Sequence, residues 1–255
     1  MCGKEDMKKI KLRDEQIKKA SEILKKYSDY DTFSKSKKDA YEFVKTVGAR
    51  VCPYCNINYI SPVFSDEEKT KGALRPDIDH YFCKSPHSEF QLCLYNLIPS
   101  CISCNERLKK NVDFMKIPHI HPYFHDFDSI MKFCVNLKEN ADCFDEKNIE
   151  IAFVPQTSAS KPLIIRAVNN IKTFKLKERY QLHAGQAVNL FKNAKYYWKA
   201  KEKEINRLLF GNSGSASNLL SFVSMGRVLF PEKDCDINQV SLGKLKRDVI
   251  HQYCL

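Results

Sequence analysis

The sequence predicts an α+β fold, in which a mostly helical chain surrounds a small core with short strands. Apolar residues recur at three- and four-residue steps before residue 50 and again after residue 162, which is the spacing of amphipathic helices. Between these stretches, residues 51–128 contain seven prolines and no long helical pattern before residue 101. Of the 255 residues, 43% are hydrophobic, which is enough for a packed core and argues against a disordered chain.

Residues 1–50 predict an N-terminal helical segment with two helices. The apolar face of the first is marked by Ile10, Ile17, Ala20, Ile23, Leu24 and Tyr27. The second is expected from about Ser36 to Val47, with Ser34 or Ser36 as its N-terminal cap and Gly48 at its end. Lysines occupy the opposite face, which we interpret as a solvated surface.

Residues 51–128 form the middle segment, which is rich in loops and holds five of the seven histidines. Four of the eleven cysteines form two C-x-x-C pairs here, at Cys52, Cys55, Cys101 and Cys104. Two residues between cysteines let one turn present both sulfurs to the same ion, so the pairs predict one structural zinc site. The alternative is that one pair is accidental. The other seven cysteines are interpreted as small buried apolar residues.

Residues 129–255 predict a C-terminal, mostly helical basic region. It begins with two strands, indicated by apolar alternation around residues 133–137 and 149–153. Helical spacing follows, and it predicts a helix from Ile164, a long helix from Leu182 to Leu209, and two more over residues 219–230 and 242–255.

Positive charge is concentrated in this third part. The formal net charge is +11, and residues 156–210 hold twelve Lys or Arg against three Asp or Glu. We therefore expect this stretch to offer a phosphate-facing surface. Tyr196, Tyr197 and Trp198 are candidates for base stacking, but aromatic residues at helical spacing more often pack in a core.

The insert between the cysteine pairs carries an acidic residue next to a histidine, Asp79 and His80. His80 has an unperturbed pKa near ~6.5, which suits a general base at neutral pH. Asp79 offers the hard oxygen ligand that Mg²⁺ or Mn²⁺ prefers. A surface pair is the common alternative for such a dipeptide. Asn105 directly follows a predicted zinc ligand, where a helix would start, so the zinc would bring Asn105 towards Asp79.

Four motifs in this order carry a family resemblance: Cys52-x-x-Cys55, Ile78-Asp79-His80, residues 95–101 with the sequence Tyr-Asn-Leu-Ile-Pro-Ser-Cys, and Cys104-Asn105. Together they resemble the HNH endonucleases, whose core is a ββα-metal motif. The variant with four zinc cysteines is also similar to the phage endonuclease VII type. The sequence that starts at Asn96, Asn-Leu-Ile-Pro-x-Cys, is more similar to HNH effectors of bacterial anti-phage systems, of the Septu and retron-associated kind.

The resemblance implies a role for each matching residue. His80 would be the general base that activates water, and Asp79 and Asn105 would hold one catalytic Mg²⁺ or Mn²⁺ against the scissile phosphate. Asn96 would orient His80 or brace the hairpin loop. The four cysteines would hold structural zinc. Relatives often carry a lysine at a fixed helical step after the last motif residue, and Leu108 takes that place here. Lys109 is therefore an accessory candidate only. Apart from the resemblance, His121 is a second accessory candidate, because a strand would place it with His119 on one face towards the metal or the phosphate; a strand with polar outward residues is the alternative.

The functional expectation is a metal-dependent endonuclease that hydrolyses DNA and acts as an anti-phage defence effector. The chain has no Walker motif, so the resemblance implies a separate ATPase partner that regulates it. Two alternatives stay open: a junction-resolving or RNA-directed nuclease, and a non-catalytic zinc-stapled module that binds nucleic acid. No apolar run approaches a membrane span, and residues 1–19 are charged throughout, so no membrane contact and a cytoplasmic location are expected.

Overall fold

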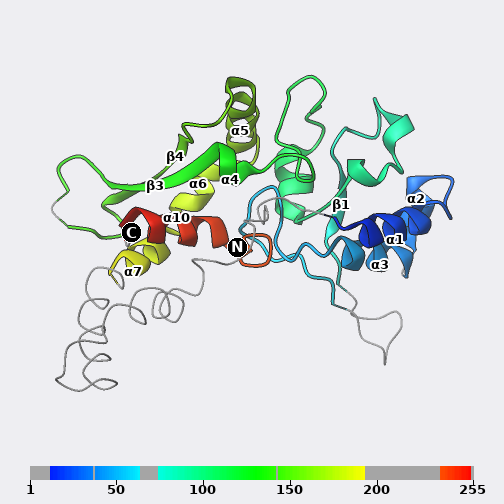
Figure 1. Ribbon diagram of the computed structural model, residues 1–255, viewed down its shortest axis with the longest axis horizontal. Coiled ribbons are helices and arrows are strands. Elements are labelled where there is room, and N and C mark those ends of the chain that lie inside the picture. Colours follow the sequence, from blue (N-terminus) through cyan, green and yellow to red (C-terminus); the bar gives the residue numbers. More distant parts are fainter. Residues whose placement is uncertain (1–11, 37, 64–73, 142, 193–235, 254–255) are drawn as a thin grey trace, which may run out of the picture. The chain divides into compact units, whose positions relative to one another are not determined.

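The computed structural model describes residues 12–36, 38–63, 74–141, 143–192 and 236–253, and the chain divides into two compact units (Figure 1). Unit 1 comprises Met1–Met131, Gln156–Leu176 and Ile237–Ser241. Unit 2 comprises Lys132–Pro155, Lys177–Asp236 and Leu242–Leu255. Residues 1–50 and 51–128 therefore share one unit, whereas residues 129–255 are divided between both. Helices and small two-stranded sheets together confirm the α+β class.

Three helices open unit 1: α1 (Asp14–Leu24), α2 (Tyr30–Lys35) and α3 (Asp39–Val47). Helix α3 matches the predicted second helix. The Ser36 hydroxyl accepts a hydrogen bond from Asp39 N at 3.0 Å, and the helix ends at Gly48, whose φ is 74°.

Helix α2 is an element that the apolar spacing did not predict. It begins because the Asp29 side chain accepts a hydrogen bond from Thr32 N at 2.8 Å and caps a new helix after α1 has ended. Phe33 of α2 is fully buried and packs edge-on against Phe43 of α3, with ring centroids 5.6 Å apart. The three helices thus share one apolar core.

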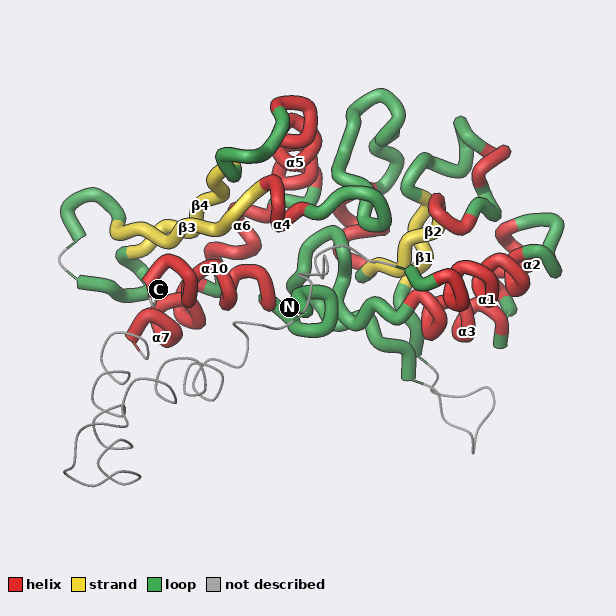
Figure 2. The backbone as a smooth tube through the Cα atoms, in the orientation of Figure 1, coloured by secondary structure: helices red, strands yellow, loops and turns green. Residues whose placement is uncertain are grey.

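The middle segment forms an antiparallel pair, β1 (Asp77–His80) and β2 (Leu97–Ser100), in which His80 lies opposite Leu97 (Figure 2). The connection between the strands carries two short 3₁₀ turns, η1 (Ser88–Phe90) and η2 (Leu94–Asn96). The helix η3 (Ser103–Lys109) follows β2 almost at once. The order is therefore strand, strand, helix.

Helix η3 is a π-helix, whose wide turn shows in the hydrogen bond from Lys110 N to Asn105 O at 2.9 Å. Single π turns are rare and occur frequently at functional sites. In this chain the π-helix begins inside the second cysteine pair and contains Cys104.

Unit 1 is completed by α4 (Phe127–Ile130) and α5 (Lys161–Thr173). Their shared core is formed by Ile120, Ile130, Met131 and Ala167. Asn170 of α5 is buried, and its side-chain oxygen accepts a hydrogen bond from Ile120 N at 2.7 Å. This bond ties α5 to the segment that follows η3.

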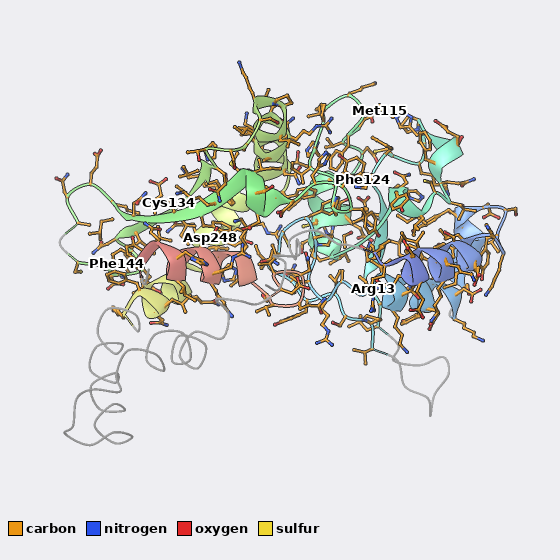
Figure 3. The ribbon with its side chains drawn as sticks, in the orientation of Figure 1. Arg13, Met115, Phe124, Cys134, Phe144 and Asp248 are labelled. Atoms are coloured by element: carbon orange, nitrogen blue, oxygen red, sulfur yellow. The ribbon has the colours of Figure 1, made fainter. Side chains whose placement is uncertain are left out.

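Unit 2 contains the sheet of β3 (Met131–Leu137) and β4 (Ile149–Pro155), with α6 (Leu176–Gln181), α7 (Ala184–Lys192) and α10 (Gly243–Tyr253). Both predicted strands are confirmed. Asp248 of α10 accepts a hydrogen bond from Phe133 N at 2.7 Å and pairs with the Lys244 ammonium at 2.8 Å (Figure 3). This contact fixes α10 against β3.

The predicted long helix from Leu182 begins two residues later, as α7 at Ala184, and α6 before it is an element that the apolar spacing did not predict. The Gln181 side chain bonds to the backbone of β4, at Ile151 N and Ile149 O, so α6 ends against the sheet. Leu182 is 84% exposed in the turn before α7. The remainder of that helix, the helix over residues 219–230, and Tyr196, Tyr197 and Trp198 lie outside the described residues.

Within the described parts of the chain, no helix is long and apolar enough to cross a membrane.

Candidate metal centre and adjoining cleft

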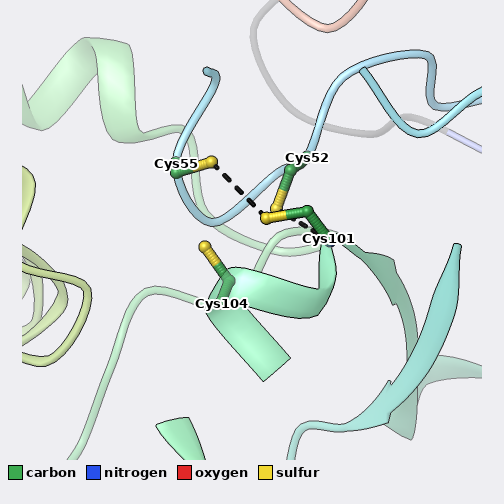
Figure 4. A group of neighbouring side chains, drawn as sticks. All are labelled: Cys52, Cys55, Cys101 and Cys104. Atoms are coloured by element: carbon green, nitrogen blue, oxygen red, sulfur yellow. Dashed lines mark hydrogen bonds between the residues drawn. The ribbon is translucent and has the colours of Figure 1, made fainter. Parts of the chain in front are cut away.

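Four buried cysteines converge from two chain segments (Figure 4). Cys52 and Cys55 lie in a turn, Cys101 lies between β2 and η3, and Cys104 is the second residue of η3. Their sulfur atoms all lie within 4.8 Å of one another, and the sulfurs of Cys55 and Cys101 are 4.0 Å apart. Tetrahedral zinc with Zn–S bonds of about 2.3 Å places its sulfurs about 3.8 Å apart, so the spacing fits a metal such as zinc.

Backbone amides point at these sulfurs. Ile57 N donates to Cys55 Sγ and Cys101 N donates to Cys52 Sγ, each at 3.4 Å. The turn is closed by Asn56, whose φ is 53°. Hydrogen bonds from the Cys104 and Cys52 thiols hold the pKa of Cys101 well below its usual range, so this side chain favours the thiolate form. Four converging sulfurs with amide donors are suited to hold one cation.

A cleft of about 840 Å³ lies in unit 1 beside this centre. It brings together Asp79 and His80 from β1 with Asn105 from η3. Three ammonium groups also line it, those of Lys84, Lys109 and Lys110. The cleft thus brings an imidazole, a carboxylate and a side-chain amide together with three lysines.

His80 sits in the cleft wall with one nitrogen engaged. Its Nε2 lies 3.0 Å from Gln91 O, and because a carbonyl only accepts, Nε2 carries the proton. The other nitrogen, Nδ1, is then the basic one. Burial lowers the pKa of His80 below its usual value, so the imidazole is neutral at pH 7.

Asp79 is buried and held from two sides. Its Oδ2 accepts a hydrogen bond from the Tyr54 hydroxyl at 2.7 Å, and its Oδ1 pairs with the Lys109 ammonium at 2.9 Å. The same ammonium donates to His80 O at 2.6 Å and is 1% exposed. Lys109, one residue beyond Leu108, is therefore the lysine that the helix directs at the end of β1.

Sequence reasoning did not find Tyr54, although it stands inside the first C-x-x-C pair. Its ring stacks on Phe174, with centroids 4.6 Å apart, and its hydroxyl reaches Asp79. The cysteine turn and the acidic residue are thus joined by one side chain. The only signal in the sequence was the position of Tyr54 between two predicted zinc ligands.

The two asparagines make different contacts. Asn105 donates from its side-chain nitrogen to Asp77 Oδ2 at 3.2 Å, which places another carboxylate beside the cleft residues. Asn96 is buried, and its side chain accepts from Phe82 N at 2.7 Å and donates to Phe82 O and Phe90 O. Asn96 braces the loop that follows β1.

His121 does not line the cleft. It is buried beside Tyr81 and Phe124, with ring centroids 4.2 and 4.5 Å away, and burial lowers its pKa to about 4. His119 is also buried, with Nδ1 2.5 Å from Ile117 O and Nε2 2.8 Å from the Thr173 hydroxyl oxygen. Both imidazoles belong to the core of unit 1.

The oxygen atoms of Asp79 and Asn105 are the ligand type that Mg²⁺ and Mn²⁺ prefer. Each oxygen of Asp79 keeps a second lone pair beyond its hydrogen bond, so the bonds to Tyr54 and Lys109 do not exhaust its acceptor capacity. Mg²⁺ commonly takes only one or two protein ligands and completes its shell with water and substrate phosphate. Apart from the cysteines, no cluster of three or more His, Cys, Asp or Glu side chains suited to a metal occurs in the described residues.

Comparisons with protein-family models, with curated proteins and with solved structures found no match for this chain.

Proposed function

We propose that this chain is a metal-dependent endonuclease of the HNH type that hydrolyses DNA phosphodiester bonds. The observation that carries the proposal is the cleft in which Asp79 and His80 of β1 meet Asn105 of η3, the helix that also contains Cys104 of the cysteine centre. A base, hard oxygen ligands and ammonium groups in one cleft suit phosphodiester hydrolysis.

In this proposal His80 is the general base. Its Nδ1 takes a proton from a water molecule, and the water oxygen bonds to phosphorus. The bond to the leaving oxygen breaks with its electron pair on that oxygen, which takes up a proton from solvent water. The hydrogen bond to Gln91 O fixes the tautomer that leaves Nδ1 unprotonated. The neutral state follows from burial of the ring.

Asp79 and Asn105 would hold one Mg²⁺ or Mn²⁺, which would supply stabilisation of the negative charge that develops on the phosphate. Lys84 and Lys110 line the same cleft and add positive charge where the nucleic acid backbone would lie. The four cysteines with zinc would keep η3, and hence Asn105, against the strands.

A second candidate is a zinc-stapled module that binds nucleic acid without cleaving it. One observation favours it: both carboxylate oxygens of Asp79 are already bonded within the protein, to Tyr54 and Lys109. A buried carboxylate with two such partners can serve structure alone. The presence of His80 and Asn105 in the same cleft favours the nuclease.

The role in anti-phage defence and the ATPase partner are proposals that rest on the motif resemblance. The partner would supply the ATP-binding machinery for which this chain has no Walker motif.

The test is cleavage of supercoiled plasmid in Mg²⁺ or Mn²⁺ by the wild type, His80→Ala and His183→Ala. We expect the wild type and the His183→Ala control, which alters a histidine in unit 2, to cleave equally. We expect His80→Ala to lose activity by at least roughly a hundredfold, the contribution of a general base. Zinc content measured on all three separates loss of chemistry from loss of fold.

Equal cleavage by the wild type and His80→Ala would contradict the assigned base. A wild type that binds DNA but never cleaves it, alone or with a candidate ATPase, would support the binding module. Single-stranded RNA and branched DNA in the same assay distinguish the remaining substrates.

A further inference from the structure

Helix α2 forms part of the wall of the cleft. Tyr30, its first residue, lines the cleft together with His80. The Tyr30 hydroxyl donates to Ile78 O in β1 at 2.7 Å, and the Tyr30 and His80 ring centroids are 4.2 Å apart with an interplanar angle of 67°. The N-terminal helical segment therefore reaches the candidate base directly.

Helix α2 also contacts the residues that precede and follow β1 in the sequence. Before the strand, Arg75 Nη2 donates to Ser34 O at 2.8 Å. After the strand, the Lys84 ammonium pairs with Asp31 at 2.6 Å and lies 5.5 Å from the centroid of the Tyr30 ring. Helix α2 is thus attached to β1 before, within and after the strand.

The His80 imidazole is held by two different contacts. The bond from Nε2 to Gln91 O fixes one ring atom, but a single hydrogen bond leaves the ring able to tilt about it. The Tyr30 ring packs against the imidazole and limits that tilt. Burial raises the pKa of Tyr30 to about 12, so its hydroxyl stays protonated and keeps donating to β1.

We propose that Tyr30 is a positioning residue for His80, an assignment that rests on the proposed nuclease function. Tyr30 fixes the imidazole so that its basic nitrogen meets the attacking water, while its hydroxyl anchors the strand that carries His80. A misplacement of about 1 Å in a catalytic group can cost a hundredfold in rate, so a side chain that fixes the base contributes to kcat.

The kinetic test compares Tyr30→Leu, Tyr30→Phe and Tyr27→Phe with the wild type. Tyr30→Leu removes the aromatic ring, and we expect kcat to fall roughly tenfold to a hundredfold with KM for DNA within about twofold. Tyr30→Phe keeps the ring and is expected to restore most of kcat. Tyr27→Phe removes a comparable hydroxyl bond, to Asp39 at 2.8 Å, from a ring that packs against Phe33, and is expected to match the wild type.

A second measurement does not depend on activity. In the folded wild type, nuclear Overhauser effects are expected between the Tyr30 ring protons and the His80 ring protons, with the His80 signals assigned by their loss in His80→Ala. In Tyr30→Leu the His80 signals should shift because the ring current of Tyr30 is gone. Tyr27→Phe should leave them in place.

An active wild type whose kcat is unchanged by Tyr30→Leu would overturn the positioning role alone. Absence of the Tyr30–His80 Overhauser effects in the folded wild type would overturn its geometric basis. A wild type that cleaves no nucleic acid, either alone or with a candidate ATPase, would overturn the proposed function, and with it this assignment. Zinc content and thermal unfolding show which variants retain the fold.

Discussion

At the scale of single residues, buried polar contacts join the cysteine centre to the cleft. Tyr54 stands between two of the cysteines and donates to Asp79, whose second oxygen pairs with Lys109. The Lys109 ammonium also lies 4.9 Å from the centroid of the Phe114 ring, so its surroundings are largely protein. A carboxylate and an ammonium removed from water in this way stabilise the protein only as a pair.

Lys109→Met should therefore destabilise the protein strongly, because it leaves the Asp79 charge buried with one neutral partner. We expect a loss of about 3 kcal/mol in the free energy of unfolding. Urea denaturation of the zinc-loaded protein measures it.

Lys110→Met is the matched control, because Lys110 is the next residue and is exposed. Its effect should stay within about 0.5 kcal/mol. Equal stabilities of the two variants would show that the buried Asp79 carboxylate does not depend on the Lys109 ammonium for its compensation.

At the scale of elements, local caps decide where the helices begin and end. Asp29 starts α2 close behind α1, and this start places Tyr30 at the cleft. Gly48 ends α3 in the left-handed conformation, and a Cβ there would meet Gln16 Nε2 at an ordinary 3.6 Å. The requirement for glycine at position 48 is therefore one of backbone conformation.

Gly48→Ala is expected to cost about 1 kcal/mol, because alanine is strained at positive φ. Gly48→Asn should retain most of the stability, since asparagine adopts this conformation more readily. Thermal unfolding of the two variants measures the difference. A loss that is equal for alanine and asparagine would mean that side-chain volume, and not φ, determines the cost.

At the scale of the whole molecule, the cysteine centre belongs to unit 1, whereas unit 2 has an apolar core of its own. In unit 2, Phe133 packs against Phe153 and Tyr180, with ring centroids 4.5 and 4.4 Å away. A structural zinc site contributes binding free energy to folding, on the order of 10 kcal/mol or more in small zinc domains. Loss of the metal should therefore act first on unit 1.

The wild type is expected to bind one zinc ion per chain, and Cys101→Ser should lose it. Hydrogen exchange should then show lost protection over residues 51–59 and 97–110, with protection in β3 and β4 retained. Cys93→Ser, which alters an exposed cysteine, should keep both the metal and the protection. Zinc-free wild type, or equal loss of protection in both units, would refute this account.

The sequence alone determined the features that depend on residues close together in the chain or on the spacing of metal ligands. The C-x-x-C spacing predicted which four cysteines meet, alternation located β3 and β4, and Gly48 located the end of α3. The Asp79, His80 and Asn105 set was also predicted, and the structure brings these residues to one cleft. The alternation and the glycine depend on residues that are close together in the chain. The cysteine pairs depend on zinc coordination, because one ion binds all four sulfurs.

Only the tertiary structure decided which side chains contact the residues of the cleft. Tyr54 and Lys109 both bond to Asp79, although they are 25 and 30 residues away from it in the sequence. Tyr30 bonds to Ile78, which is 48 residues away. A tyrosine in a helix or a lysine in a basic stretch carries no local sign of its partner. The packing of α2 and η3 against β1 brings these partners within hydrogen-bond distance and removes them from water, and that burial gives each contact its strength.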